Sequence, residues 1–378
     1  MSDGEDEVTG NTGPIVAIVG AGIGGIYLIA ELGLMGCKLR LTDRNEATLT
    51  EVRARGGVEV EDGTGTRLAI VERATTDLRA AVDGADIIIV VTGGNAQGAA
   101  ARVLAPLLRD GQVILLIQGN TGGSLIVRRA LDEVGCRANV DIAEMDNYPL
   151  SCWRLGPARI RPIVRKRFLQ IAAFPGRRGA AVFPRLAPLF PTAVLAENVI
   201  YTGFTNANAM LHVANCVANA AQIERGQTYK FYAEGVTPAV ARLYEAINGE
   251  RVAVAAALGA SVPNLADWFE RTYGVRGKDL VETCQLLTAK PDGPYQATGT
   301  PKSLDHKYVT EDVPTGLIPM SALGAAVGVN TPAIDALVAV ASQMTGKSFA
   351  AEARSLDRLG LAGLDSRGIR RTVDDGFR

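Results

Sequence analysis

The stretch that decides the fold is Ile15–Leu32, which has the sequence IVAIVGAGIGGIYLIAEL. Its opening run of small and β-branched apolar residues is typical of a buried strand, and its closing residues are typical of an apolar helix. Between these segments, Gly20, Gly22 and Gly25 form a GxGxxG pattern. The first glycine permits a tight turn, the second lets the backbone approach a pyrophosphate, and the third allows close packing of helix on strand. The stretch therefore predicts a phosphate-binding turn at a helix N-terminus, made of Gly20, Gly22, Ile23, Gly24 and Gly25.

A carboxylate further along the chain supports a dinucleotide as the ligand. The apolar run Leu39–Thr42 is followed by Asp43, eighteen positions after Gly25, where a carboxylate can accept the hydroxyl groups of an adenosine ribose. The turn and the carboxylate together predict a Rossmann domain that binds NAD or NADP. Asp43 favours NAD because a carboxylate repels a 2′-phosphate, but the adjacent Arg44 could pair with that phosphate. The choice stays open, with a slight preference for NAD.

Two further strands end in small polar loops. Strands and helices alternate as far as about Pro175, a pattern that predicts a parallel sheet. Its clearest strands are Ile15–Val19, Leu39–Thr42, Ile87–Val91 and Val113–Ile117, and the last two end in these loops. Ligands of such sheets lie outside the carboxyl ends of the strands. We therefore expect three residues of these loops to face the ribose and nicotinamide, namely Gly93, Asn95 and Asn120. The alternative is that the glycines only form turns and the asparagines only cap helices.

The second half of the chain has a helical character. Three alanine-rich stretches with glycines near their ends are predicted helices, and the last two have prolines at their starts: Asn206–Arg225, Thr237–Leu258 and Thr331–Met344. The predicted fold is an α/β N-terminal Rossmann dinucleotide-binding domain over residues 14–200, followed by an all-α C-terminal substrate domain over residues 201–378. An acidic, disordered tail is expected over residues 1–13.

The composition limits the classes of partner. The 378 residues carry 39 basic and 40 acidic side chains, with no long basic run, which argues against nucleic acid or an anionic membrane and favours a small ligand. The five cysteines show neither a CxxC pair nor a zinc spacing, so we expect reduced thiols and no metal site. No signal-peptide pattern and no membrane-length apolar run occur. We expect a cytoplasmic protein, and a homodimer as the commonest assembly.

One predicted helix carries a polar stripe that includes a histidine. Asn208, His212, Asn215, Asn219 and Gln222 recur at steps of four, three, four and three, which places them on one helical face. Burying such groups without partners is costly, so the stripe is expected to line a solvated cleft or an interface. The alternative is a histidine that only joins two helices by a hydrogen bond. The chain has only two histidines, and the histidine side chain titrates near neutral pH. His212 is therefore a candidate general acid or base.

Several motifs follow one another in a recognisable order. They are GAGIGG (20–25), QGNTGG (118–123), AEMDNYP (143–149), NANAMLHVANCVANA (206–220), YKFYAEGVTPAVA (229–241), KYVTEDVPTGLIP (307–319) and LGAAVGVNTPAID (323–335). In these motifs, from Ile15 to about Gly346, the chain resembles the octopine/nopaline (opine) dehydrogenases. The asparagine–histidine helix and the TEDVP stretch make the resemblance specific in the helical half.

The resemblance implies a reaction and two catalytic residues. A 2-oxo acid and the amino group of an amino acid or related amine would form an imine, which NAD(P)H reduces to a secondary amine. The catalytic histidine of the family corresponds to His212 and its partner carboxylate to Asp312. A protonated imidazole can polarise the oxo group and protonate the departing water, and a carboxylate stabilises the imidazolium. Asn208 and Asn215, on the same face as His212, are predicted to bind substrate.

The chain departs from the family at two positions. Val213 stands where many members have proline, and Lys307 where many have arginine, which weakens the expectation of a bidentate grip on a substrate carboxylate. Arg154 or Lys230 could bind that carboxylate instead, and His306 is expected to be a solvated loop residue. Two alternative functions stay open: a dehydrogenase of the ketopantoate reductase type that uses no amine, and a non-catalytic NAD(H)-binding protein.

Overall fold

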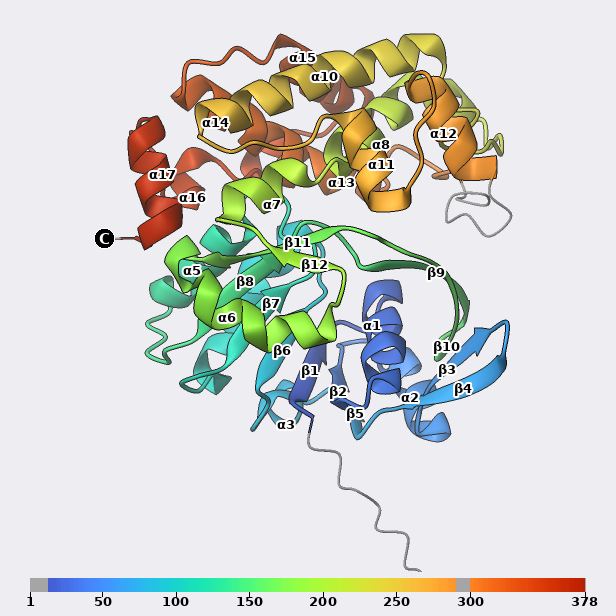
Figure 1. Ribbon diagram of the computed structural model, residues 1–378, viewed down its shortest axis with the longest axis vertical. Coiled ribbons are helices and arrows are strands. Elements are labelled where there is room, and N and C mark those ends of the chain that lie inside the picture. Colours follow the sequence, from blue (N-terminus) through green and yellow to red (C-terminus); the bar gives the residue numbers. More distant parts are fainter. Residues whose placement is uncertain (1–12, 290–299, 378) are drawn as a thin grey trace, which may run out of the picture. The chain divides into compact units, whose positions relative to one another are not determined.

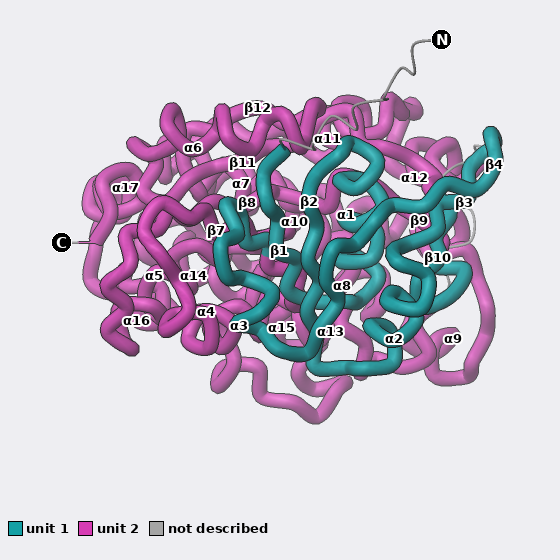
Figure 2. Tube along the Cα trace, turned by 90° about the horizontal axis from the view of Figure 1, so that it is seen from below, with its two compact units in different colours: residues 1–89, 154–161 teal, residues 90–153, 162–378 magenta. Residues whose placement is uncertain are grey.

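The computed structural model describes residues 13–289 and 300–377, and the chain divides into two compact units. Unit 1 takes in Met1–Ile89 and Arg154–Arg161, and unit 2 takes in Val90–Trp153 and Pro162–Arg378, coloured teal and magenta in Figure 2. This division differs from the predicted boundary between residues 200 and 201, because the chain from Val90 onward clusters with the helical half. All of the predicted acidic tail except Gly13 lies outside the described residues.

Unit 1 contains the glycine-rich turn and a parallel sheet, in the strand order β6-β1-β2-β5. The strand β1 pairs in parallel with β2 along its whole length, and β2 pairs in parallel with β5. The strands predicted in this part of the chain are confirmed, and most of their apolar residues are buried. The elements are β1 (Ile15–Val19), α1 (Ile23–Leu34), β2 (Lys38–Thr42), α2 (Glu46–Arg55), β3 (Gly57–Asp62), β4 (Gly65–Ile70), β5 (Arg73–Thr75), α3 (Leu78–Val82) and β6 (Ile87–Val90).

A second, small sheet was not predicted. Its strand order is β4-β3-β10-β9, with β9 at Leu150–Gly156 and β10 at Arg159–Arg165. Most residues of β4 are exposed, and β9 and β10 are largely exposed or half-buried. Because little of this sheet is buried, the sequence lacks the apolar runs by which strands are recognised.

Unit 2 contains the other strands, in the order β12-β11-β8-β7: β7 (Val113–Leu116), β8 (Asp141–Met145), β11 (Leu169–Phe174) and β12 (Ala193–Leu195). The strands β7 and β8 are parallel, but β11 runs antiparallel to β8. The prediction of a wholly parallel sheet is therefore wrong at β11. The chain passes from β8 to β11 through the strands β9 and β10 instead of a crossover helix, and only parallel neighbours need such a helix.

The helical half is confirmed as helical. Its α-helices are α7 (Val199–Thr205), α8 (Asn208–Ala218), α9 (Ala220–Glu224), α10 (Pro238–Ala257), α11 (Leu265–Tyr273), α12 (Leu280–Ala289), α13 (Lys307–Thr310), α14 (Ile318–Ala326), α15 (Pro332–Thr345), α16 (Leu356–Leu359) and α17 (Ser366–Asp375); α4 (Gln97–Leu104), α5 (Gly123–Glu133) and α6 (Gly179–Leu186) come earlier in unit 2. The predicted helix over 206–225 is interrupted at Asn219, whose φ of −111° and ψ of 18° leave the α-helical region. No helix among the described residues is both long and apolar enough to cross a lipid bilayer.

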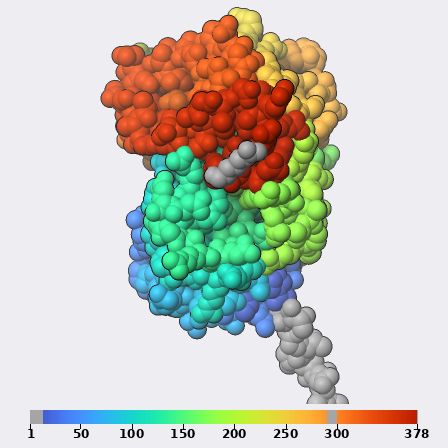
Figure 3. Space-filling model, turned by 90° about the vertical axis from the view of Figure 1, so that its left-hand side faces the viewer, coloured from blue at the N-terminus to red at the C-terminus, as the bar shows by residue number. Residues whose placement is uncertain are grey.

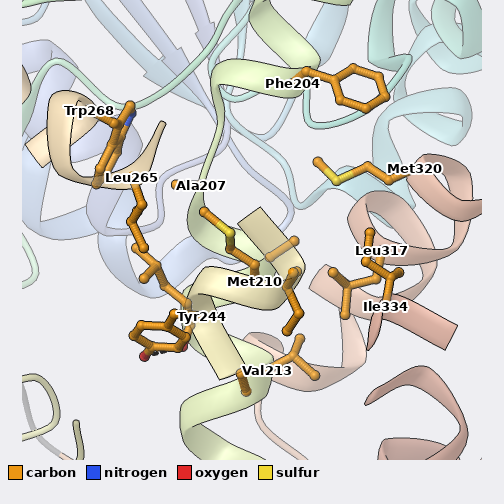
Figure 4. Packing of buried hydrophobic residues seen from close by; sticks show 14 of the residues in the cluster. Phe204, Ala207, Met210, Val213, Tyr244, Leu265, Trp268, Leu317, Met320 and Ile334 are labelled. Carbon is orange, nitrogen blue, oxygen red and sulfur yellow. Dashed lines mark hydrogen bonds between the residues drawn. The ribbon is translucent and has the colours of Figure 1, made fainter. Parts of the chain in front are cut away.

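The core of the helical half forms around α8. Met210 and Val213 of α8 point toward a cluster that includes Tyr244 of α10 and Ile334 of α15 (Figure 4). Burying side chains of this size contributes about 1.5–3 kcal/mol each. The helix α7 packs on β11 on one side and on α10 on the other, and so joins the strands of unit 2 to its helices (Figure 1).

Candidate active site

The glycine-rich turn in unit 1 has the geometry that a pyrophosphate needs. A Cβ atom added to Gly25 would lie 1.8 Å from the carbonyl oxygen of Gly20, so only glycine permits this approach of α1 to the strand end. A Cβ added to Gly22 would meet nothing within 4 Å, and Gly22 is exposed. The helix α1 begins at Ile23 without a side-chain cap, so its first N–H groups are available to an anion. The residues present therefore fit a dinucleotide phosphate.

Asp43 is held beside this turn. Its Oδ2 accepts a hydrogen bond of 2.6 Å from the N–H of Ala21, and its Oδ1 accepts one of 2.8 Å from the N–H of Asn45. These bonds place the carboxylate at the end of β2 next to the glycine turn, which agrees with a role toward the ribose. The neighbouring Arg44 is exposed.

Unit 2 brings the predicted catalytic pair together. Nδ1 of His212, on α8, lies 2.7 Å from Oδ2 of Asp312, and only 13% and 11% of the two side chains are exposed. The ring of Tyr308 stacks on the imidazole with centroids 3.9 Å apart and planes inclined by 19°. Because Nδ1 is bound to the carboxylate, Nε2 is the nitrogen left for the reaction. The pair is thus a histidine oriented by a carboxylate, as general acid–base chemistry requires.

An irregular helical turn delivers Asp312 to the histidine. Asp312 precedes a π-helix, η5 (Val313–Leu317), which is a rare turn type that is frequent at functional sites. A Cβ added to Gly316 would lie 2.4 Å from the Cβ of Ala209, so η5 and α8 approach each other at a pair of small residues. This close approach explains why the pair forms across a sequence separation of one hundred residues.

The loops after β6 and β7 contact the same segment of unit 2. The N–H of Gly94 donates to Oε1 of Glu311 over 2.8 Å, and Nδ2 of Asn120 donates to Oγ1 of Thr315 over 3.0 Å. Gly93 lies so close to Glu311 that an added Cβ would be 3.0 Å from the carboxylate, whereas Asn95 is exposed. Two predicted cofactor residues, Gly93 and Asn120, therefore lie beside the segment that carries Asp312.

The loop after β7 has an unusual backbone. Gln118 and Asn120 have φ angles of 61° and 53°, which residues other than glycine adopt at an energetic cost. Such strain is commonly found at functional sites, where surrounding contacts maintain it. The side chain of Asn120 accepts a hydrogen bond from Asn206 in addition to its bond with Thr315, and these contacts hold the strained loop in place.

Unit 2 also contains buried ionisable groups. Asp146, after β8, and Lys166, after β10, are only 3% and 4% exposed. Burial raises the pKa of the Asp146 carboxyl and lowers the pKa of the Lys166 ammonium, and each group opposes the shift of the other. Burial and the Asp312 carboxylate raise the pKa of the Cys216 thiol to about 12, so this thiol stays protonated at neutral pH and is a poor nucleophile.

Comparisons with known proteins agree with this geometry. The chain is 33% identical over 358 residues to an opine dehydrogenase of Arthrobacter sp. (strain 1C), an alignment that covers 95% of this chain and 98% of the relative. The chain belongs to the opine dehydrogenase family. The resemblance noted in the sequence is confirmed, and the chain is an NAD(P)-dependent oxidoreductase acting on CH–NH groups.

Family models and solved structures support the same assignment. Residues 195–345 match the NAD/NADP octopine/nopaline dehydrogenase alpha-helical domain, and residues 16–135 match the ketopantoate reductase PanE/ApbA model. A structure of octopine dehydrogenase with NADH and L-arginine has a TM-score of 0.75 at 19% identity, covering 97% of this chain and 98% of that one. Yersinopine dehydrogenase with NADP⁺ has a TM-score of 0.70 at 18% identity, with coverages of 97% and 99%. The predicted fold class, a Rossmann domain followed by a helical domain, is confirmed.

The polar stripe of this dehydrogenase is not a cleft lining along its whole length. Asn215 is fully buried, and its Nδ2 donates to the carbonyl of Phe231 over 2.8 Å. Asn219 is also buried and donates to the carbonyl of Gly235. The segment after α9 folds back against α8 and supplies these acceptors. The prediction that Asn215 binds substrate is therefore wrong, while Asn208 is half-buried and stays a candidate.

The predicted carboxylate-binding cations differ in availability. The guanidinium of Arg154, in unit 1, donates from Nε to the carbonyl of Gly156 and from Nη2 to the carbonyl of Pro157 and to Oγ1 of Thr48. Arg154 is exposed, and its role toward a substrate carboxylate stays a prediction. Lys230 is exposed in unit 2, and so is Lys307.

His306 is a helix cap instead of a solvated loop residue, which corrects the prediction. Its Nδ1 accepts the N–H of Tyr308 at the start of α13, and its ring meets the edge of Tyr308 at 4.5 Å between centroids. Burial and the charge of Lys307 lower the pKa of His306.

Sequence reasoning missed three residues that contact the site, namely Tyr308, Glu311 and Arg354. Tyr308 and Glu311 lie in the motif that pointed to Asp312, so their positions were a signal. Arg354 lies beyond the motifs and gave none. Among the described residues, no group of three or more His, Cys, Asp and Glu side chains is placed to hold a metal ion.

Proposed function

We propose that this chain performs the reductive condensation of its family through His212 and Asp312, joining a 2-oxo acid to the amino group of an amino acid or a related amine. The observation that carries the proposal is the 2.7 Å contact between Nδ1 of His212 and Oδ2 of Asp312. NAD is the preferred cofactor in this proposal because Asp43 lies beside the glycine turn. A cytoplasmic location and a homodimer are retained as predictions from the sequence.

A nicotinamide cofactor supplies the hydride when it is bound. We assign its pyrophosphate to the turn Gly20–Gly25 and its adenosine ribose to Asp43, for the reasons of geometry given above. We assign its nicotinamide half to Gly93, Asn95 and Asn120. The support for the last assignment is that the loops after β6 and β7 contact the Asp312 segment through Glu311 and Thr315.

The imidazole performs the proton transfers in this mechanism. The Nε2–H of protonated His212 donates to the oxo oxygen, which makes the carbonyl carbon more electrophilic toward the amine. When the amine adds, the oxo oxygen takes this proton and becomes a hydroxyl, and Nε2 takes up the proton that the new ammonium group releases. The Nε2–H then protonates the hydroxyl of this carbinolamine, so that water departs and an iminium forms. Asp312 stabilises the imidazolium in each protonated state, because its carboxylate is held against Nδ1 in a site from which most water is excluded.

We assign substrate recognition to Asn208, Lys230 and Lys307, whose side chains are half-buried or exposed. Asn208 is half-buried one helical turn before His212 and can reach a substrate bound at Nε2. Lys230 and Lys307 are the exposed cations that can attract a substrate carboxylate as point charges.

A steady-state assay tests the function. The oxidation of NADH and of NADPH is followed with a panel of 2-oxo acids alone, and then with amino acids and other amines added. We expect oxidation only when both a 2-oxo acid and an amine are present. Oxidation without an amine would instead assign the chain to the ketopantoate reductase type of reaction. Tight cofactor binding without turnover would make it a non-catalytic NAD(H)-binding protein.

A further inference from the structure

Gly94, in the loop after β6, is held by charged side chains at both of its backbone polar groups. Its N–H donates to Oε1 of Glu311 over 2.8 Å, and its carbonyl accepts from Nη2 of Arg354 over 2.8 Å. Glu311 precedes Asp312 directly in the sequence, so the bond to Gly94 and the bond to His212 start from neighbouring residues.

Arg354 contacts both cofactor-facing loops with one guanidinium group. Nη1 donates to the carbonyls of Gly119 and Thr121, at 2.7 and 2.9 Å, and Nη2 donates to the carbonyl of Gly94 and to Oε1 of Gln97, at 2.8 and 2.7 Å. All four N–H groups at the two terminal nitrogens are therefore used. A lysine ammonium has three N–H donors around a single atom and cannot make this planar fork.

The backbone of Arg354 adds a third connection. Its N–H donates over 3.0 Å to the carbonyl of Pro314, which lies in the π-helix that follows Asp312. The segment 352–355 runs between the short turn η6 (Phe349–Ala351) and α16, and the chain at this end lies on the face of unit 2 coloured orange to red in Figure 3. One residue near the C-terminus thus links the loop after β6, the loop after β7 and the segment of Asp312.

The Arg354 guanidinium is buried, so its position depends on the groups that it binds. Arg354 is 3% exposed, and burial lowers its pKa to about 10, which leaves it charged at neutral pH. The carboxylates of Glu144 and Glu311 oppose that shift. A buried cation with all its terminal donors in use has a single well-defined position, and it imposes that position on the carbonyls it binds.

We infer that Arg354 is a positioning residue of the reaction, which fixes the two nicotinamide-facing loops relative to Asp312 and His212. The inference rests on the proposed function for the role of those loops. Arg354 itself contacts carbonyl groups and one amide, so it acts on the hydride-transfer step through the loops. A displacement of about 1 Å in such a site costs about a hundredfold in rate.

The test compares Arg354→Lys with Arg358→Lys, a matched control in the same segment. Arg358 is exposed, and its Nη1 donates to the carbonyl of Ala353. For Arg354→Lys we expect kcat to fall by about 10- to 100-fold. We expect the KM for NADH to change by less than about threefold, because the glycine turn in unit 1 still binds the adenosine half. A residue of purely structural importance would instead lower the temperature of unfolding and leave the kcat of the folded enzyme unchanged.

Hydrogen–deuterium exchange gives a readout that does not depend on activity. In Arg354→Lys, amide exchange should become faster in both peptides that span residues 92–97 and 118–124, and in neither of them in Arg358→Lys. If Arg354→Lys retains the wild-type kcat and the wild-type exchange in both loops, the inference is overturned. If the wild-type enzyme shows no amine-dependent oxidation of NADH, the proposed function fails, and the exchange measurement still decides whether Arg354 fixes the loops.

A double-mutant cycle tests whether both charges act on Gly94 together. Glu311→Ala removes the acceptor of the Gly94 N–H, and Arg354→Lys weakens the hold on its carbonyl. Because both changes release the same residue, their combined loss in kcat should be smaller than the product of the two separate losses. A combined loss equal to that product would show that the two side chains act independently, which contradicts a shared positioning role.

Discussion

A histidine whose Nδ1 is bound to a carboxylate has its tautomer and its ring orientation fixed. In this enzyme the stacking of Tyr308 and the buried Asp312 restrict the imidazole further, since the ring contacts an aromatic plane on one side. Nε2 has no hydrogen-bond partner among the residues that the structure describes, which leaves it free for a substrate. In the proposed function, this arrangement separates catalysis from cofactor binding, because neither residue of the pair belongs to the glycine-rich turn.

That separation predicts the effect of removing the imidazole. His212→Ala should lower kcat by about 100- to 10,000-fold, the usual contribution of a general acid–base group. Asp312→Asn should lower kcat as well, because an amide cannot stabilise the imidazolium as a carboxylate does. The dissociation constant for NADH, measured by fluorescence titration, should stay nearly unchanged in both variants. A large loss of NADH binding in His212→Ala would place this residue outside the role proposed.

Cofactor preference also depends on one side chain. Asp43→Ala removes the carboxylate that would repel a 2′-phosphate, so the ratio of kcat/KM for NADH to that for NADPH should fall. The exposed Arg44 provides the comparison, since Arg44→Ala should change this ratio in the opposite direction if its guanidinium pairs with the phosphate. An unchanged ratio in Asp43→Ala would mean that Asp43 does not contact the ribose.

At the scale of single elements, the start of α1 contains two glycines with different roles: Gly25 permits close packing, and Gly22 leaves room for the pyrophosphate. In Gly25→Ala the new Cβ would clash with the carbonyl of Gly20 at 1.8 Å, so we expect a loss of about 1–3 kcal/mol in the free energy of unfolding. Gly22→Ala is the matched control, because its Cβ has open space and its φ of −65° suits alanine. This variant should keep its stability and lose NADH affinity, since the methyl group occupies the approach of the pyrophosphate. Chemical denaturation and NADH titration distinguish the two effects.

The same elements show how far sequence reasoning reaches. The strands β1, β2, β6 and β7 were predictable because their buried apolar runs lie between glycine-rich turns, and α10 and α15 because prolines and glycines mark their ends. The location of Asn215 was not predictable. A helical stripe shows which residues share a face, but the segment that packs on that face, here the residues around Phe231, is distant in sequence.

The proposed catalytic pair, His212 and Asp312, shows the same limit of prediction from sequence. Its two residues were inferred from family motifs, whereas the physical reason for their meeting is the contact of Gly316 with Ala209, which no local pattern reveals. Arg354 was missed entirely, because its acceptors are backbone carbonyls, and backbone groups leave no trace in residue identity.

For the molecule as a whole, the buried pair Asp146 and Lys166 predicts how stability depends on pH. The pKa of Asp146 is raised above its ordinary value of 3.8, so its contribution to stability is complete below that pH and is lost as the pH rises. The pKa of Lys166 is lowered from 10.5, so its contribution is complete above that pH and is lost as the pH falls. Near neutral pH the stability contributions of both Asp146 and Lys166 are therefore reduced.

The test removes one or both members of the pair. Asp146→Asn or Lys166→Met alone should reduce the free energy of unfolding at neutral pH, by about 3–5 kcal/mol where it leaves a buried charge unpaired. The double variant should be closer to the wild type in stability at pH 7, and should lose the wild-type decrease between acidic and neutral pH. Urea denaturation at pH 5, 7 and 9 measures both effects. Equal pH profiles for the wild type and the double variant would contradict the assignment.

The division of the chain at Ile89 and Val90 has a consequence for engineering. A chimera designed to change the nucleotide specificity of this enzyme would ordinarily exchange the whole predicted Rossmann segment up to residue 200. Such an exchange would replace the loops after β6 and β7 with loops of another protein, and so would change their contacts with Glu311, Thr315 and Arg354. A graft limited to residues 14–89 and 154–161 would transfer the glycine turn and Asp43 while leaving those partners native. The segment that must be exchanged to change nucleotide specificity is therefore shorter than the predicted Rossmann domain.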